Sequence, residues 1–225
     1  MKKDICLIVL LFFVPVLTFS QDLEIESVNF RKIKKEIKKK RSPYYYPGLY
    51  QRYLDLDTSL NAMDFRYLYY GFSFQQAYCP YGTPILRDSL ISYLQREDPL
   101  QAELEVAAKL AGELLRESPF RLRETFIAAV AFEMSGNEAM SAIYYGFFEK
   151  QVEAIMSSGD GLTKETAFTV IYIPDEYEIL EVLGFSFGGG QSLTEDNYDL
   201  LQLEQNPYEI SELYFNVNRL IEVGF

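Results

Sequence analysis

Residues 159–173 read GDGLTKETAFTVIYI, and the pattern of the chain changes across them. Before this stretch, apolar residues recur every three or four positions, as they do in amphipathic helices. After it, β-branched and aromatic residues form short runs or alternate with polar ones, which is typical of strands. The sequence therefore predicts an α+β fold, with an N-terminal antiparallel helical part followed by a small, mostly antiparallel β-sheet that contains one short helix.

The sheet part is expected to follow the order β-α-β-β-β. Asp175-Glu176-Tyr177-Glu178 resembles a capping box, so a short helix should begin there and end at Gly184. Gly188-Gly189-Gly190 predicts a turn or a bulge between two short strand segments. The expected strands are 167–173, placed at the centre of the sheet, then 185–187 with 191–193, 198–204 and 213–217.

Three helices are expected between residues 98 and 157, and short loops should make them antiparallel neighbours. Asp98-Pro99 is expected to begin the first, Ser118-Pro119 the second and Asn137 the third, with Gly136 as a stop. The second helix should turn these residues inward: Leu122, Phe126, Ala129 and Val130. Ala107, Ala111, Leu114 and Pro119 resemble the second helix of a tetratricopeptide-type repeat in part, and a plain antiparallel helix pair is the alternative.

Tyrosines gather upstream of these helices, between residues 44 and 81. One helix is expected from Pro47 to about Leu56, and another after Leu60 with Asn61 as its N-cap. A tyrosine cluster can line a ligand groove, or it can pack in the interior with each hydroxyl bonded, and both interpretations stay open. The candidate ligand-binding residues are Tyr67, Tyr69, Tyr70, Tyr78 and Tyr81. Cys79, which lies among them, is expected to be a small buried thiol.

Charge is unevenly distributed along the chain. Residues 31–41, RKIKKEIKKKR, hold eight basic residues and one acid, whereas the whole chain has a net charge of -12. Phe30, Ile33 and Ile37 lie at helical spacing, so an amphipathic helix with a cationic face is expected. That face could contact an anionic lipid or glycan surface, or it could dock on the acidic body of the protein. Nucleic acid is not an expected partner, because the remaining surface would repel phosphates.

The first 21 residues have the layout of an export signal. Lys2 and Lys3 precede a short apolar run, and the small residue Ser20 lies near the expected cleavage point. Cys6 is too early for lipid attachment, so we expect an exported protein, periplasmic or extracellular, that is not a lipoprotein. The expected segments are 1–21 as a cleaved signal peptide, 22–43 as a basic lead-in helix, 44–158 as the tyrosine-rich helical part, and 159–225 as a β-rich part that forms one unit with 44–158.

The residue types that are missing narrow the possible chemistry. The chain has no histidine and no tryptophan, and Cys79 would be its single cysteine after cleavage. Histidine-dependent nucleophilic sites and disulfide exchange are thereby disfavoured. No cofactor is expected, although Asp160 and Glu165 could hold Ca²⁺ together with backbone carbonyls. The carboxylate pairs Asp175 with Glu178 and Asp55 with Asp57 could serve glycoside hydrolysis only across a cleft, and caps and turns explain them better.

Several of these segments together resemble an exported bacterial family catalogued as domain of unknown function 4919. The segments that carry the resemblance are YLYYG at 67–71, YCPY at 78–81, GDG at 159–161 with KETAF at 164–168, DEY at 175–177, QSL at 191–193 and LYF at 213–215. The resemblance implies export and a single unit over most of the mature chain. It implies no activity, cofactor or catalytic residue.

These observations lead to two expectations about function. The first is a non-enzymatic binding or protein-interaction module of the cell envelope that uses the tyrosine-rich segment and the helical hairpin. Its partner would be an envelope protein, a peptide or a glycan. The alternative is a histidine-free hydrolase that acts on cell-wall or other polysaccharide with two carboxylates.

Overall fold

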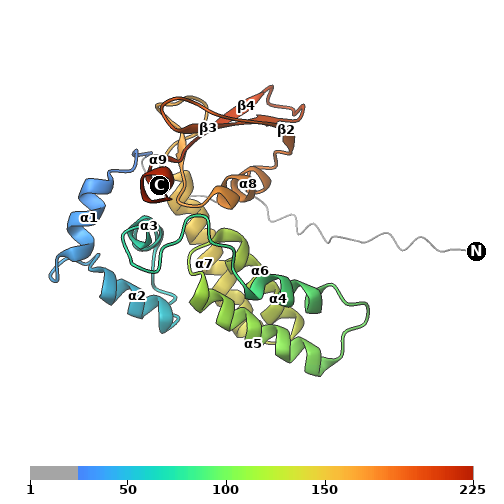
Figure 1. The fold of residues 1–225 in the computed structure, drawn as a ribbon. Helices are drawn as coiled ribbons and strands as arrows, with labels where there is room; N and C mark the ends of the chain where they lie inside the picture. The colour runs from blue at the N-terminus through green and yellow to red at the C-terminus, as the bar shows by residue number, and fades with distance from the viewer. Residues whose placement is uncertain (1–24, 225) are drawn as a thin grey trace, which may run out of the picture.

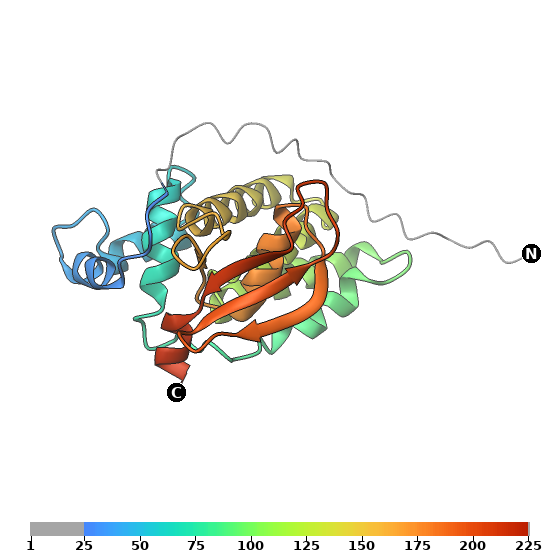
Figure 2. The ribbon, with the colours of Figure 1, turned by 90° about the horizontal axis from the view of Figure 1, so that it is seen from above.

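The structure is a computed structural model and describes residues 25–224. Within them, helices α1 to α7 form one part of the molecule, and the sheet lies across one end with α8 between the two parts (Figure 1). Figure 2 shows the sheet from above, with α8 crossing beneath its strands. The expected α+β architecture is therefore confirmed. The expected signal peptide, residues 1–21, lies outside the described residues.

Of the first three helices, α1 and α2 both pack on α3. The three are α1 (Phe30–Lys38), α2 (Tyr46–Leu54) and α3 (Ala62–Phe72). Ile33 and Ile37 are buried, so the apolar stripe of α1 faces the protein interior, where α1 packs on α3. Asn61 and Asp64 form the capping box that begins α3, as the sequence predicted for Asn61.

Four helices follow: α4 (Leu86–Leu94), α5 (Gln101–Glu117), α6 (Leu122–Met134) and α7 (Glu138–Met156). Each packs on the next in the chain. Asn137 caps α7, and Gly136 adopts a φ of +81° after α6, as expected. The sequence did not predict α4, which has no side-chain cap and begins after the Thr83-Pro84 segment.

Two expected helix starts are wrong. Asp98 takes a φ of +50° instead of capping α5, and the helix begins at Gln101, where Glu103 bonds the backbone N–H of Leu100. Phe120 takes a φ of +66°, so α6 begins three residues after Pro119. Leu122 and Ala129 are buried as expected, whereas Phe126, also expected to face inward, is 42% exposed.

The sheet is mixed and has the strand order β1-β4-β3-β2. Its strands are β1 (Phe168–Thr169), β2 (Phe187–Leu193), β3 (Tyr198–Leu203) and β4 (Glu212–Asn216). β1 pairs parallel to β4, and the other pairings are antiparallel. The expected bulge is present, because the β2–β3 register shifts between Phe187 and Gln191.

The run 167–173 is not the central strand that the sequence predicted. It lies at the sheet edge and forms ladder pairs at only two residues, because tyrosine hydroxyls of the helical part bond its backbone from Thr169 to Ile171. Helix α8 (Ile173–Val182) then begins two residues before the expected cap at Asp175, with Pro174 in its first turn. Gly184 follows it with a φ of +77°, and a last helix, α9 (Asn218–Gly224), was not predicted.

A candidate ligand-binding hollow

The five tyrosines proposed from the sequence do not line one groove. Tyr69 and Tyr70 of α3 are fully buried, Tyr67 and Tyr78 are buried, and Tyr81 is half exposed. The Tyr69 hydroxyl donates to Asp175 Oδ2 at 2.7 Å and accepts from the Ile171 N–H at 3.1 Å. The hydroxyls of Tyr70 and Tyr78 donate to the carbonyls of residues 169 and 171. Tyr69, Tyr70 and Tyr78 therefore pack as core with bonded hydroxyls, which agrees with the second interpretation that the sequence left open.

A hollow of about 320 Å³ lies elsewhere in the helical part, between the C-terminal end of α2 and the helices α5, α6 and α7. Its polar groups come from Tyr53, Lys109, Arg116 and Tyr144. Its apolar walls come from Leu54, Leu56, Leu115, Phe132 and Met140. A small hollow with apolar walls and a few convergent polar groups is the usual form of a ligand site.

Two tyrosines with unbonded hydroxyls line this hollow. Tyr53 is 4% exposed, and its hydroxyl is buried without a hydrogen-bond partner. Tyr144 is also buried, and its hydroxyl makes no hydrogen bond with any described residue. Burial raises the pKa of both phenols, so both remain protonated and able to donate. An unbonded buried hydroxyl costs free energy that a ligand acceptor could recover.

Two cations flank an open position on α5. Lys109, Gly112 and Arg116 are spaced by three and four residues and therefore share one face of the helix. Both cations are exposed, and neither takes part in an ion pair among the described residues. A Cβ atom added at Gly112 would have nothing within 4 Å, so this glycine leaves space between the two charges. The Arg116 charge also acts on Tyr144, where it opposes the rise in pKa that burial causes.

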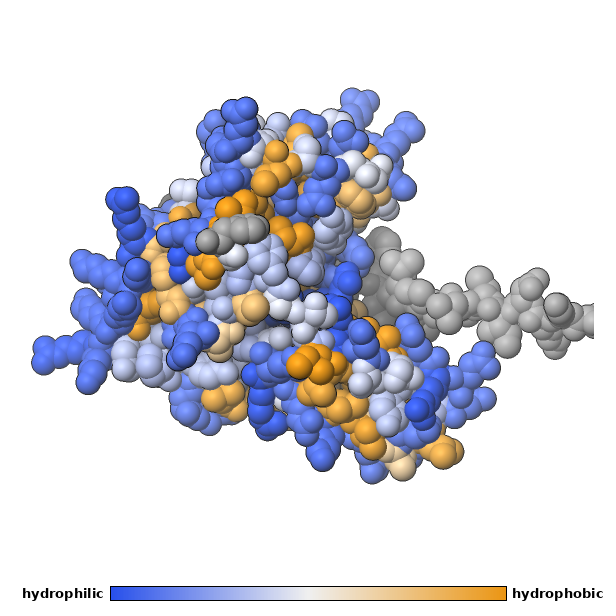
Figure 3. Space-filling view, in the orientation of Figure 1, coloured by the Kyte–Doolittle hydropathy of each residue, from blue (hydrophilic) through white to orange (hydrophobic). Residues whose placement is uncertain are grey.

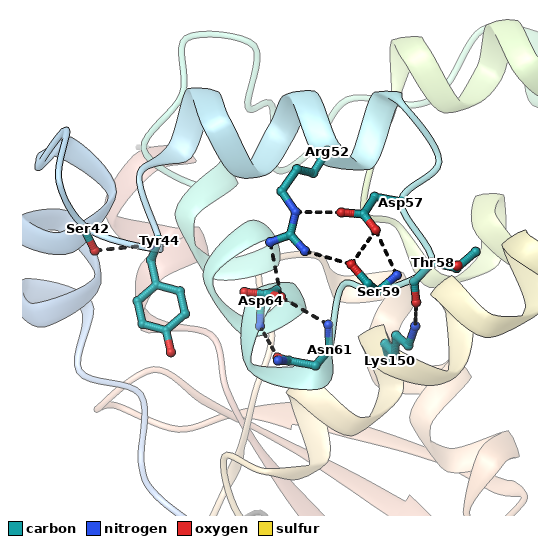
Figure 4. A network of polar contacts seen from close by, with 9 residues as sticks. All are labelled: Ser42, Tyr44, Arg52, Asp57, Thr58, Ser59, Asn61, Asp64 and Lys150. Atoms are coloured by element: carbon teal, nitrogen blue, oxygen red, sulfur yellow. Dashed lines mark hydrogen bonds and ion pairs between the residues drawn. The ribbon is translucent and has the colours of Figure 1, made fainter.

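A polar network holds the α2 side of the hollow in place (Figure 4). Arg52 Nε donates to Asp57 Oδ2 at 2.7 Å, and its guanidinium also pairs with Asp64 in the first turn of α3. Asp57 accepts hydrogen bonds from the backbone N–H and the hydroxyl of Ser59. The bonds from Ser59, together with the bond from Arg52, lower the pKa of Asp57 to about 2. Lys150 of α7 donates to the Thr58 carbonyl at 3.1 Å. The network links the end of α2 to α3 and α7, and Tyr53 follows Arg52 directly.

This arrangement suits an anion that carries an apolar body. Two cations and two phenolic donors can bond a carboxylate, while the leucines and Met140 can cover a hydrocarbon chain. The hollow contains no acidic side chain. The charged side chains that line the hollow are therefore all positive, whereas the whole chain has a net charge of -12.

The acidic loop proposed as a Ca²⁺ site is arranged as a turn. Asp160 Oδ1 accepts from the Leu162 N–H at 2.9 Å and from the Thr166 hydroxyl at 2.6 Å, whereas Glu165 is exposed. In the described part of the chain, no group of three side chains suited to a metal ion comes together. Cys79, expected to be buried, is exposed, because Tyr78 and Pro80 on either side of it take the buried positions of this turn.

The carboxylate pairs considered for hydrolysis are bonded within the protein. Asp55 accepts from Gln51, and Glu178 pairs with Arg123. Asp175 is buried between the Tyr69 hydroxyl and the Leu122 N–H, and burial raises its pKa to about 7. None of these carboxylates lines the hollow.

A different acid pair lies between α8 and the sheet. Glu176 is fully buried, and neither of its carboxyl oxygens has a hydrogen-bond partner among the described residues. Burial, followed by the charge of the nearby Asp199, raises the pKa of Glu176 well above its usual value. Gln191 Nε2 donates to Asp199 at 3.0 Å and Tyr177 donates to Gln191 at 2.7 Å, which ties α8 to the sheet.

Sequence reasoning missed the residues of the hollow. One signal was available: Gly112 interrupts a run of good helix formers, AAKLAGELLR, with a cation three residues before it and another four residues after it. The contribution of Tyr53 had no such signal, because it is one of ten tyrosines between residues 44 and 81.

The chain is an α+β protein whose helical part carries a small hollow lined by two cations, two tyrosines and apolar side chains. The chain belongs to the family described as a domain of unknown function, DUF4919, whose model matches residues 31–223. The match covers all four strands and begins at the cationic segment of α1. Searches of the curated proteins and of the solved structures found no significant match to this chain.

Proposed function

We propose that the chain is an exported, non-enzymatic binding module of the cell envelope, and that the hollow between α2 and α5–α7 binds a carboxylate that carries an apolar chain. The observation that supports this most strongly is that Tyr53, whose buried hydroxyl has no hydrogen-bond partner, is among the residues that line the hollow. Lys109 and Arg116 supply positive charge at the same place. Export rests on the leader-like layout of residues 1–21.

The size of the hollow limits the ligand. A volume of about 320 Å³ lies at the lower end of the range for small-molecule sites, so the bound portion is a short chain or one terminal residue. A free short-chain fatty acid and the C-terminal residue of a peptide share this chemistry, because each joins a carboxylate to an apolar group. The Leu54 side chain, 44% exposed at the rim, leaves one side of the hollow open for the rest of a longer ligand.

Calorimetric titration of residues 22–225, which contain every described residue, tests the proposal. The probes are octanoate, acetate, 1-octanol, and an acetylated tripeptide that ends in leucine with either a free or an amidated C-terminus. Octanoate or the free-acid peptide should bind, and acetate, octanol and the amide should not, because only the first two join a charge to an apolar group. The two supporting outcomes distinguish a lipid-derived ligand from a peptide ligand.

A charge variant with a matched control completes the test. Replacing Lys109 and Arg116 by Gln should lower the affinity at least tenfold, since each charge-assisted bond contributes roughly 1.5–3 kcal/mol. Replacing Lys35 of α1 and Lys39 directly after it by Gln removes the same charge outside the hollow and should leave the affinity unchanged. Equal affinities in the two variants, or no binding of any carboxylate probe, would overturn the proposal.

A further inference from the structure

The cationic segment 31–41 forms a separate surface at one extremity of the molecule. Figures 1 and 2 show α1 at the end of the helical part, away from the sheet and from α5 to α7. In Figure 3, hydrophilic side chains project from that same end. All eight basic residues of the segment are exposed, and the segment contains a single acid, Glu36.

These cations are not neutralised by the rest of the protein. Lys32 pairs with Glu26 at 3.7 Å, and this is the one ion pair of the segment within residues 25–224. The Glu36 carboxylate is engaged by the Ser42 hydroxyl at 2.7 Å. The segment carries seven net positive charges, eight basic minus one acidic, on a chain whose total is -12. Docking of this face on the protein's own acidic body, the alternative expected from the sequence, is therefore limited to Lys32.

A second hollow, of about 460 Å³, adjoins this surface where α1 meets α3 and α9. Lys34 and Lys38, one turn apart on α1, line it together with Gln75, Gln76 and Arg219. Arg219 is held in place because it donates to Ser73 Oγ at 3.1 Å and to the Ser73 carbonyl at 2.7 Å. Its guanidinium lies 4.0 Å from the centre of the Phe74 ring. Arg219 also pairs with Glu222 at 2.8 Å, whereas Lys34 and Lys38 form no ion pair among the described residues. These two lysines, with Arg219 and the amides beside them, suit a phosphate-bearing head group.

We propose that this cationic surface, residues 31–41 with the adjoining hollow, docks the protein on a membrane surface rich in anionic lipid, and that charge alone makes the contact. The apolar stripe of α1 is used internally, since Ile33 and Ile37 are at most 4% exposed, so the helix has no apolar face left to insert. No helix of residues 25–224 is long and apolar enough to cross a bilayer. Because α1 lies at one extremity of the molecule, the sheet and helices α5 to α7 lie away from any surface that the segment contacts (Figures 1 and 2).

Vesicle co-sedimentation of residues 22–225, which lack the apolar leader, tests this proposal. Vesicles of phosphatidylcholine with about 30% phosphatidylglycerol should bind the protein in 0.1 M salt, and phosphatidylcholine alone should not. Replacing Lys35, Lys38, Lys39 and Lys40 by Gln should lower the partition coefficient about a hundredfold or more. Replacing the same four residues by Arg keeps the charge and should keep the binding.

Three outcomes would overturn the proposal: equal binding to neutral vesicles, unchanged binding of the Gln variant, or no binding to anionic vesicles. Binding to an acidic polysaccharide such as alginate, with none to vesicles, would assign the surface to a glycan instead. The four lysines lie outside the α2–α5 hollow, so the octanoate affinity should not change in either variant. Failure of this proposal is therefore distinguishable from failure of the hollow as a ligand site.

Discussion

Two sets of buried tyrosines in this protein differ in what their hydroxyls contact. Tyr69 and Tyr70 on α3 bond groups about a hundred residues away in the chain, on the segment between Thr169 and Asp175. Tyr53 and Tyr144 are buried to a similar extent, yet neither hydroxyl has a partner among the described residues. The first pair joins the helical part to the start of the sheet part, and the second lines a hollow.

The comparison teaches that burial alone does not distinguish a structural tyrosine from one available to a ligand. The bonding of the hydroxyl distinguishes them, because a native core leaves few buried polar atoms unbonded. Tyr46 is a useful third case: its hydroxyl is also buried and unbonded, but Tyr46 does not line the hollow. It provides a control in which the same deletion is made away from the site.

The largest expected effect comes from breaking the bonded set. Tyr69→Phe should destabilise the protein by about 3–4 kcal/mol, because it leaves both Asp175 Oδ2 and the Ile171 N–H buried without a partner. For a chain of this length the melting temperature should fall by roughly 6–16 °C. Thermal unfolding followed by circular dichroism measures this. A loss below about 1 kcal/mol would contradict the structural role given to this hydroxyl.

A second effect is expected on the pH dependence of stability, because Tyr69 bonds the buried carboxyl group of Asp175. Burial is the main cause that raises the pKa of Asp175, and the bonds from Tyr69 and Leu122 oppose the rise. The Glu124 charge raises this pKa and the Arg121 charge lowers it, and the net result is a pKa of about 7. The unfolded state ionises this group near pH 4, so between pH 4 and 7 the folded state binds more protons. Its contribution to stability is therefore present below about pH 4 and is lost as pH rises through about 7.

Urea unfolding at pH 5 and pH 8 measures this dependence. Asp175 should make the protein less stable at pH 8 than at pH 5 by on the order of 3 kcal/mol. The Glu176–Asp199 pair changes stability in the same direction, because the pKa of each acid is raised, with burial as the first cause. Asp175→Asn does not titrate and should reduce the difference. A protein more stable at pH 8 than at pH 5 would contradict this account.

A smaller effect is expected at the hollow itself. Gly112→Ala should stabilise α5 by about 0.5–1 kcal/mol, because the space beside Gly112 is open and alanine is the better helix former. Gly112→Leu places a larger side chain in the same space and should abolish octanoate binding while the fold is retained. Unfolding and titration of the two variants measure both effects. Unchanged binding in the Leu variant would show that the ligand lies elsewhere.

The architecture was predictable because it depends on periodicity and stop signals that are local in the chain. The N-caps at Asn61 and Asn137 and the stops at Gly136 and Gly184 were all predicted from adjacent residues. The edge position of segment 167–173 was not predictable, because tyrosines about a hundred residues upstream compete with neighbouring strands for its backbone. The position of each tyrosine likewise depends on contacts with residues that are distant in the sequence.

The candidate site was predictable only at the level of segments. The sequence indicated the tyrosine-rich stretch and the helical hairpin, and the hollow does lie between them. The five tyrosines that it indicated do not line the hollow, and the place of Tyr53 there depends on packing between helices that are distant in the sequence. The cationic face was predictable from the charges of residues 31–41, whereas Arg219 of α9 comes from the far end of the chain.

The most direct test of the account is a comparison of Tyr53→Phe with Tyr46→Phe by titration with octanoate and the free-acid peptide. Each variant removes one unbonded buried hydroxyl, so neither should be less stable than the parent. The account predicts that Tyr53→Phe lowers the affinity about tenfold or more and that Tyr46→Phe leaves it unchanged. Equal affinities in the two variants would contradict the claim that an unbonded hydroxyl marks the ligand site.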